Sequence, residues 1–143
     1  DSDATAGILN ARSIDGDGAG IGGGYQGSGS CSNIIIDSCS VIASSKYGAG
    51  IGGSKQHAGS DITINSSSVT ASSTNGDGIG GGYEYGGSCK NITINGGSVK
   101  ATRLDYKPQN SSEQNVYCCT IENKNSDVVI IDGNSTSWEP KIT

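Results

Sequence analysis

A six-residue glycine block occurs three times in this chain, and its spacing restricts the possible folds more than any other feature. The copies are Gly18–Gly23 (GAGIGG), Gly48–Gly53 (GAGIGG) and Gly76–Gly81 (GDGIGG). Their central isoleucines are 30 and 28 residues apart, at Ile21, Ile51 and Ile79. A fixed period of this length indicates a repeat protein, in which each repeat stacks on the next and buries a face that it cannot bury alone.

Two β-branched runs follow each block and predict two strands per repeat. The first runs are Ile34–Ile36, Ile62–Ile64 and Ile92–Ile94, and the second are Val41–Ala43, Val69–Ala71 and Val99–Ala101. Within each run the apolar residues alternate, which is the period of a strand that buries one face. Helices are not expected here, because glycine is frequent and no apolar stripe has helical spacing.

With the glycine block as a third strand, the chain is expected to be all-β, a right-handed parallel β-helix (β-solenoid) of about four coils with 28–30 residues per coil. Handedness follows from the general rule for parallel connections. The chain is expected to form one domain over 1–143. Within it we expect an N-terminal cap or partial coil at 1–14, three regular repeats at 15–103, an irregular insertion at 104–127 and a degenerate last coil or cap at 128–143.

A polar residue follows each isoleucine run and predicts a turn ladder. Its members are Asp37, Asn65, Asn95 and, because Val129–Ile131 looks like a fourth isoleucine run, Asp132. Asn and Asp side chains at a tight turn can pass hydrogen bonds between stacked repeats, and they tolerate the left-handed backbone conformation.

Composition limits the partners of the chain. The net charge is −5 and no basic stripe occurs, so nucleic-acid binding is not expected. No run of 18 apolar residues occurs, so no membrane-spanning helix is expected.

The cysteine count favours an oxidising compartment. The five are Cys31, Cys39, Cys89, Cys118 and Cys119. Cys31 and Cys89 occupy the same repeat position two coils apart, about 9.6 Å at the spacing of neighbouring strands, which is too far for a direct disulfide. A Cys31–Cys39 pair and a pair of Cys89 with Cys118 or Cys119 remain open, and one cysteine is left unpaired or bonds another chain.

Four sequons are candidate N-glycosylation sites, at Asn65, Asn91, Asn110 and Asn134. Of these, Asn91 and Thr93 are expected to point outward if Ile92 and Ile94 point inward.

No catalytic constellation is evident in the sequence. The glutamates are scattered and do not align between repeats, and His57 has no visible nucleophile partner. We therefore expect no enzyme, and no cofactor or metal. Calcium is a weaker alternative, through oxygen ligands from 15–18 and 75–78.

Tyrosines after the glycine blocks are the candidate ligand-binding residues. Tyr25 and Tyr83 align, Tyr85 follows, and Lys55 takes the equivalent place in the second repeat. Exposed tyrosines on a rigid repeat protein can stack on sugar rings. Burial under the loop and packing against another subunit are equally open.

The repeat residues also resemble a known pattern. GAGIGG followed by ITIN and GSVKA resembles the glycine-rich repeats of extracellular, mostly bacterial, surface proteins, and is similar to the pectin-lyase-like right-handed β-helices and, more distantly, to polymorphic adhesins. The resemblance covers residues 15–103, with a weaker echo at 128–136. It implies a cell-surface location and an adhesive or scaffold role, and it transfers no catalytic residues because no lyase motif matches.

The leading hypothesis is therefore an extracellular structural or adhesive protein, a surface or filament subunit that self-associates through its coil ends. The alternatives are a carbohydrate-binding module that uses Tyr25, Tyr83 and Tyr85, and a polysaccharide-degrading enzyme.

Overall fold

The computed structural model describes residues 7–14, 16–26, 29–83, 89–102, 121–123 and 129–131, and this part of the chain contains ten strands and no helix. The strands are β1 (Ile8–Arg12), β2 (Ile21–Gly22), β3 (Cys31–Asp37), β4 (Ser40–Ser45), β5 (Ile51–Gly52), β6 (Gly59–Ser73), β7 (Ile79–Gly80), β8 (Cys89–Ala101), β9 (Ile121–Asn123) and β10 (Val129–Ile131). All pairings are parallel, and they form a seven-stranded and a three-stranded sheet.

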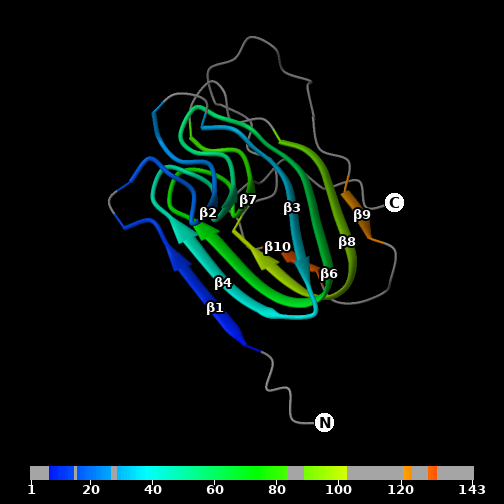
Figure 1. Cartoon of the computed structure of the whole chain (residues 1–143). Helices are drawn as coiled ribbons and strands as arrows, with labels where there is room; N and C mark the ends of the chain where they lie inside the picture. The colour runs from blue at the N-terminus through cyan, green and yellow to red at the C-terminus, as the bar shows by residue number, and fades with distance from the viewer. Residues whose placement is uncertain are drawn as a thin grey trace.

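Three columns of stacked strands account for these pairings (Figure 1). The isoleucine column consists of β3, the first half of β6, the first half of β8, and β9. The valine column consists of β1, β4, the second halves of β6 and β8, and β10. The glycine column consists of β2, β5 and β7. Each strand therefore pairs with the same segment of the next repeat, as the sequence period predicts.

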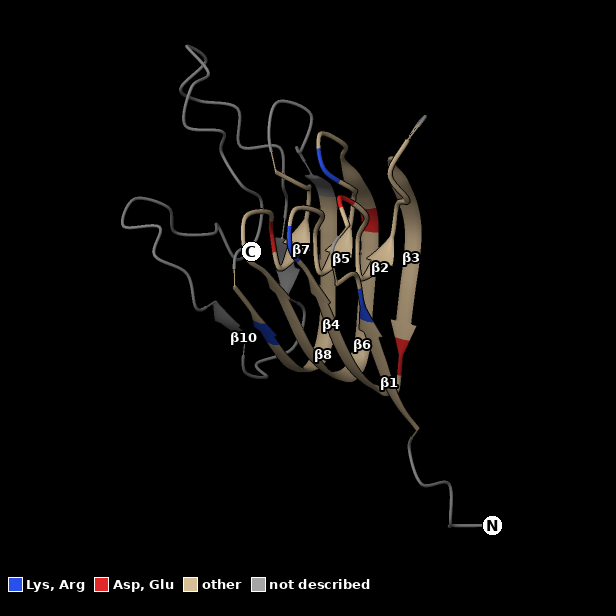
Figure 2. Cartoon of the chain, turned by 90° about the vertical axis from the view of Figure 1, so that its left-hand side faces the viewer, with Lys and Arg blue, Asp and Glu red and all other residues tan. Residues whose placement is uncertain are grey.

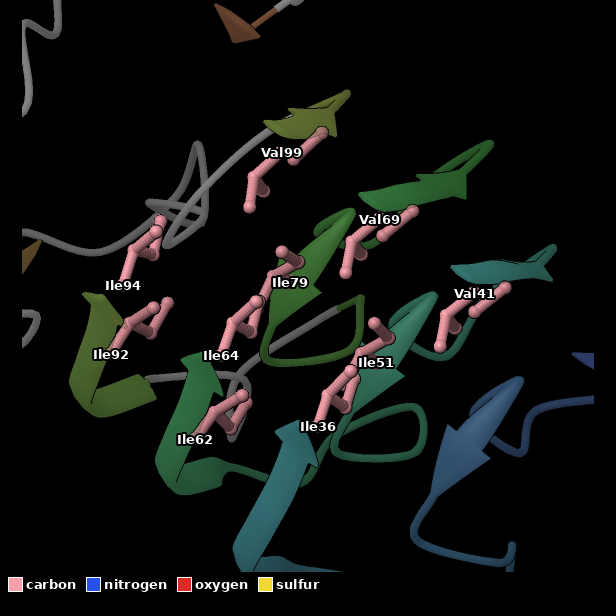
Figure 3. Packing of buried hydrophobic residues seen from close by; sticks show 13 residues of the cluster. Ile36, Val41, Ile51, Ile62, Ile64, Val69, Ile79, Ile92, Ile94 and Val99 are labelled. Carbon is pink, nitrogen blue, oxygen red and sulfur yellow. The ribbon is translucent and has the colours of Figure 1, made fainter. Parts of the chain in front are cut away.

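The core lies between the columns, and Figure 3 shows their side chains pointing toward one another. Ile62, Val69 and Ile79, one from each column, are 0–1 % exposed. Each such side chain stabilises the fold by about 1.5–3 kcal/mol relative to leaving it in water. Within β6, buried and more exposed residues alternate over 62–64 and 67–73, as expected for strands with one inward face, and the alternation is interrupted at Asp61 and Ser66, where φ is 53° and 43°.

At one position of the glycine column, neighbouring repeats approach each other with no side chain between them. Gly22, Gly52 and Gly80 share one position and have φ of 131°, 135° and 138°, a region that favours glycine. A Cβ built on Gly52 would fall on the carbonyl oxygen of Gly80. The blocks are therefore sites of close backbone approach and not phosphate-binding loops, which require a following helix.

The turn ladder is present between Asn65 and Asn95, where the Asn95 side-chain amide donates to Asn65 Oδ1 at 2.7 Å. Asp37 is in register with Asn65, although its carboxylate accepts from the Ser38 hydroxyl at 3.1 Å. The left-handed backbone that we expected at these positions occurs one residue later. That column contains Ser38, Ser66 and Gly96, with φ of 51°, 43° and 78°.

The predicted register of the last repeat is wrong. Val129–Ile131 pairs with Val99–Ala101, so it belongs to the valine column and not to the isoleucine column. The isoleucine position is taken by β9, which lies inside the segment expected to be irregular (104–127). The prediction that Asp132 extends the turn ladder rested on the wrong column, because the strand before it belongs to the valine column. Asp132 itself lies outside the described residues. An apolar triplet alone does not distinguish the two columns.

The glycine column ends in a side-chain cap. In the first two repeats the last N–H of the block, from Gly23 or Gly53, donates to the next repeat at 2.9 Å. In the third repeat the equivalent N–H, from Gly81, donates to Asp77 Oδ2 at 3.0 Å. Asp77 is fully buried and replaces the alanine of the two preceding blocks, Ala19 and Ala49. The carboxylate thus supplies the acceptor that a further glycine strand would otherwise provide.

Candidate functional site

The loop tyrosines do not form one platform. Tyr25 is 49 % exposed, whereas Tyr83 is half-buried and Tyr85 lies outside the described residues. Tyr25 and Tyr83 share a position in their repeats but are separated by Lys55 of the repeat between them. Of the two described tyrosines that follow a glycine block, Tyr25 is therefore exposed and Tyr83 is packed.

Tyr47, which the sequence analysis did not consider, is the centre of an aromatic cluster. Its ring centroid is 6.3 Å from that of Tyr83, with the planes tilted by 46°. The Nζ atoms of Lys46 and Lys55 lie 5.1 and 5.3 Å from the Tyr47 centroid, within the range of cation–π attraction. Alignment of the repeats could not single out Tyr47, because the equivalent residues in the other repeats are Asp17 and Asn75 and so no column of aromatic residues exists at this position.

The loops after the second and third blocks are fixed by backbone bonds to the turn of the preceding repeat. The Lys55 N–H donates to the Asp17 carbonyl at 2.6 Å, and the Tyr83 N–H donates to the Tyr47 carbonyl at 2.8 Å. Lys55 Nζ also lies 3.9 Å from Asp17 Oδ1. Lys55 is thus paired within the molecule, and Tyr83 packs against Tyr47.

The calcium hypothesis has no assembled ligand set in the described part of the chain. Asp17 and Asn75 share a column but are separated by Tyr47, and the Asp77 carboxylate is engaged by the Gly81 N–H. Among the described residues, no group of three or more His, Cys, Asp or Glu side chains is close enough to hold a metal ion.

His57 has a serine neighbour, but the geometry is not that of a nucleophile and its base. Nδ1 lies 3.0 Å from Ser54 Oγ and 2.8 Å from the Lys55 carbonyl oxygen. Because a carbonyl oxygen only accepts, Nδ1 must carry the proton, and it then has no lone pair with which to activate Ser54. Ser54 is also fully buried. The pair fixes the loop that follows the second glycine block.

Cys31 and Cys39 are free thiols, each partly buried, at the two ends of the segment that contains β3. The register places Gly59 between Cys31 and Cys89, so these cysteines are two repeats apart as expected. Cys118 and Cys119 lie outside the described residues, as do the sequon residues Asn110 and Asn134.

The two described sequons differ in accessibility. Asn91 is exposed, and its side-chain amide donates to Asp61 Oδ1 at 2.9 Å. Asn65 is half-buried in the turn ladder, and its sequon residue Ser67 is 2 % exposed with its hydroxyl bonded to the Asn65 carbonyl at 2.7 Å. Asn91 is therefore the more accessible of the two.

A second surface feature escaped the sequence analysis: a polar groove of about 380 Å³ where the valine column leads into the glycine blocks. It crosses three repeats and is lined by Arg12, Ser13, Ile14, Ser44, Ser45, Lys46, Ser72, Ser73 and Thr74. The equivalent positions carry different residue types in each repeat, for example Arg12, Ser44 and Ser72. The lining residues come together only because the repeats stack, so no sequence motif predicts the groove.

Comparison with known proteins identifies the repeat alone. A family model described as a β-helix repeat matches residues 34–55, 62–83 and 92–103. No curated protein matches the chain, and no solved structure does. No helix in the described part of the chain is long and apolar enough to cross a membrane. The matched segments begin at the isoleucine run of each repeat and the first two extend through the following glycine block, so this chain is similar to β-helix repeat proteins in the segments that build its columns.

Proposed function

We propose that this chain is a structural protein whose repeats form a right-handed β-helix of about four coils, and that copies associate end to end through the edge made by β1, β2 and β3. The observation that carries the proposal is the exposure of core positions at that edge. Leu9 of β1 is 52 % exposed, whereas Val41 and Val69, at the same position of the next two repeats, are 2 % and 1 % exposed.

The backbone of this edge supports the same proposal. In the described part of the chain β1 pairs only with β4, β2 only with β5, and β3 only with β6. Each therefore presents one unpaired edge, which is a template for a further strand. At the opposite end, β9 and β10 each pair only with β8 in the described part of the chain and so offer edges for the valine and isoleucine columns to continue, whereas the glycine column there is closed by Asp77, which accepts the last N–H.

A second copy is the occupant that fits this edge. A continuing ladder requires parallel strands with β-branched residues at alternate positions, which the repeats of this chain contain. Contact between unlike ends is heterologous, and it produces a filament when the rotation does not close a ring.

The proposal places the protein outside the cell, as a surface or adhesive scaffold, and assigns it no enzymatic activity. The resemblance of the repeats to those of surface proteins supports this location, together with the exposed sequon at Asn91. The Ser54–His57 geometry gives no support to hydrolytic chemistry.

Sedimentation velocity and negative-stain electron microscopy over a concentration series test the proposal. We expect the wild type to form elongated oligomers and Leu9→Lys to remain monomeric, because a charge on an edge strand opposes pairing. Ile42→Lys is the matched control, since Ile42 is 45 % exposed on the outer face of the valine column and is not in an edge strand. A wild type that stays monomeric at millimolar concentration contradicts the proposal.

Sugar binding is a second candidate function, supported by the exposed Tyr25 ring after the first glycine block. A glycan array with the wild type and with Tyr25, Tyr83 and Tyr85 all replaced by Ala tests it. Binding that disappears in the triple variant but persists in Tyr47→Ala supports a site at the three predicted tyrosines. No binding, or binding unchanged in the triple variant, counts against it.

A further inference from the structure

The polar groove defined above is lined by three short columns of side chains, one member from each of three repeats. Arg12, Ser44 and Ser72 form one column in the observed register. The ladder continues beyond the strands, because the Ser13 N–H donates to the Ser44 carbonyl at 2.9 Å and the Thr74 N–H donates to the Ser45 carbonyl at 3.2 Å. The lining side chains are thus held on backbone that is fixed by hydrogen bonds, so the groove is pre-organised.

The groove is electropositive although the chain as a whole is acidic. It contains Arg12 and Lys46, and neither Asp nor Glu is among its lining residues. Within the described residues neither cation is in ion-pair contact with a carboxylate; the ion pair found there joins Lys55 to Asp17. The net charge of the chain is −5. A small region of unneutralised positive charge on such a protein favours an anionic ligand.

The described part of the valine column carries positive charge and no negative charge. The described valine-column segments 7–14, 40–46, 68–74 and 97–102 contain Arg12, Lys46 and Lys100 and no acidic residue. The described carboxylates of Asp37 and Asp61 belong to the isoleucine column. Figure 2 shows basic segments on or next to β1, β4 and the second half of β8, and acidic segments on β3, on the first half of β6 and beside the glycine column.

Five hydroxyls of the groove, those of Ser44, Ser45, Ser72, Ser73 and Thr74, fall into two classes. Those of Ser45 and Ser73 donate to the carbonyls of Gly18 and Gly48, each at 2.7 Å, so their protons are committed to the fold. Those of Ser44, Ser72 and Thr74 make no hydrogen bond in the described part of the chain, and they remain available as donors. The groove therefore combines a guanidinium fork, an ammonium and free hydroxyl donors.

We infer that this groove binds a tetrahedral oxyanion, the phosphate or sulfate group of a larger ligand, through Arg12, Lys46 and the hydroxyls of Ser44 and Ser72. A phosphate presents three strong acceptor oxygens, and these can receive the fork of an arginine, an ammonium and a hydroxyl at once. A carboxylate has two oxygens in one plane and matches fewer of the donors that converge here. The inference concerns the side of the stack and is independent of end-to-end association.

Titrations of the isotopically labelled chain with phenyl phosphate, phenyl sulfate and benzoate, followed by NMR, test the inference. The three probes share a ring and differ in the anion. We expect phenyl phosphate or phenyl sulfate to bind with shifts of the Ser13, Ser44 and Ser72 amides, and benzoate to bind at least about tenfold more weakly because it leaves charged donors unused.

Binding of both esters, or of either one alone, supports the site and identifies the anion that it accepts. Benzoate binding as tight as that of the esters overturns the inference, as does the absence of shifts at millimolar concentrations of all three probes.

Variants separate the groove from the general charge of the face. Arg12→Ala and Lys46→Ala are each expected to weaken ester binding about tenfold. Arg12→Lys restores the charge but not the fork, and it recovers only part of the affinity. Lys100→Ala is the matched control, since it removes the same charge from the same face outside the groove. Equal weakening by Lys100→Ala shows non-specific attraction and overturns the assignment. Circular dichroism verifies that each variant is folded.

Discussion

In the glycine column β2, β5 and β7 stack backbone on backbone, whereas in the isoleucine column successive strands stack side chain on side chain. Both are buried: Ile51 of one column and Ile62 of the other are fully inaccessible. They differ in what holds neighbouring repeats together. The isoleucine column gains stability from the apolar area that it buries, and the glycine column depends on a close approach that any Cβ prevents.

The two columns therefore tolerate substitutions differently. A packed side chain can be shortened at the cost of a cavity, and its neighbours relax in part. A carbonyl oxygen of the next repeat cannot move aside without breaking the ladder to which it belongs.

Gly52→Ala is expected to be the most damaging single change. Its Cβ would fall on the Gly80 carbonyl oxygen, and φ of 135° is strained for any L-residue. We expect a loss of more than about 3 kcal/mol in the free energy of unfolding, measured by urea denaturation. Gly24→Ala is the matched control, because a Cβ there meets nothing within 4 Å. Similar stabilities for the two variants would refute the steric account.

Ile62→Ala tests the column built from side chains. Ile62 is fully buried, so we expect a loss of about 2–5 kcal/mol from removed contacts and the cavity left behind. Ile34→Ala removes the same atoms one repeat earlier, at the half-buried position of β3, and is expected to cost clearly less. Equal losses would show that the edge repeat is as well packed as the interior, against the open edge on which the proposed assembly depends.

Asp77 tests how the glycine column ends. Asp77→Ala restores the residue of the other two blocks but removes the acceptor of the Gly81 N–H, and we expect a loss of about 1–3 kcal/mol. Asp77→Asn keeps an acceptor oxygen of similar shape and is expected to cost less. Thermal denaturation monitored by circular dichroism ranks the two. A variant with Ala that is as stable as the wild type would show that the cap contributes nothing.

Much of the fold could be predicted because each repeat is a short segment in which the same residue types recur at the same spacing. The pairings Ile34 with Ile62 and Ile51 with Ile79 follow from the period alone, and the structure confirms both. The last repeat was misplaced because Val129–Ile131 fits either apolar column by composition. A short apolar triplet has no turn residue that identifies its column, so only long-range pairing assigns it.

The candidate sites were less predictable, for a related reason. Tyr25 and Tyr83 were chosen because they align, yet the residue at the centre of the aromatic cluster is Tyr47, which aligns with no other aromatic residue. The cluster arises because each loop folds back onto the turn of the preceding repeat, as the Tyr83–Tyr47 backbone bond shows. Side chains at unrelated repeat positions then become neighbours.

The parallel columns, the inward isoleucines and valines, and the need for glycine where backbones meet can all be predicted from the amino-acid sequence, because each follows from a residue type that recurs at a fixed period. The tertiary structure alone decided the register of the last strands, the role of Asp77 and the groove that contains Arg12 and Lys46. These features depend on residues that differ from one repeat to the next. They form only when stacking brings the repeats to about 4.8 Å from one another, the spacing of neighbouring strands.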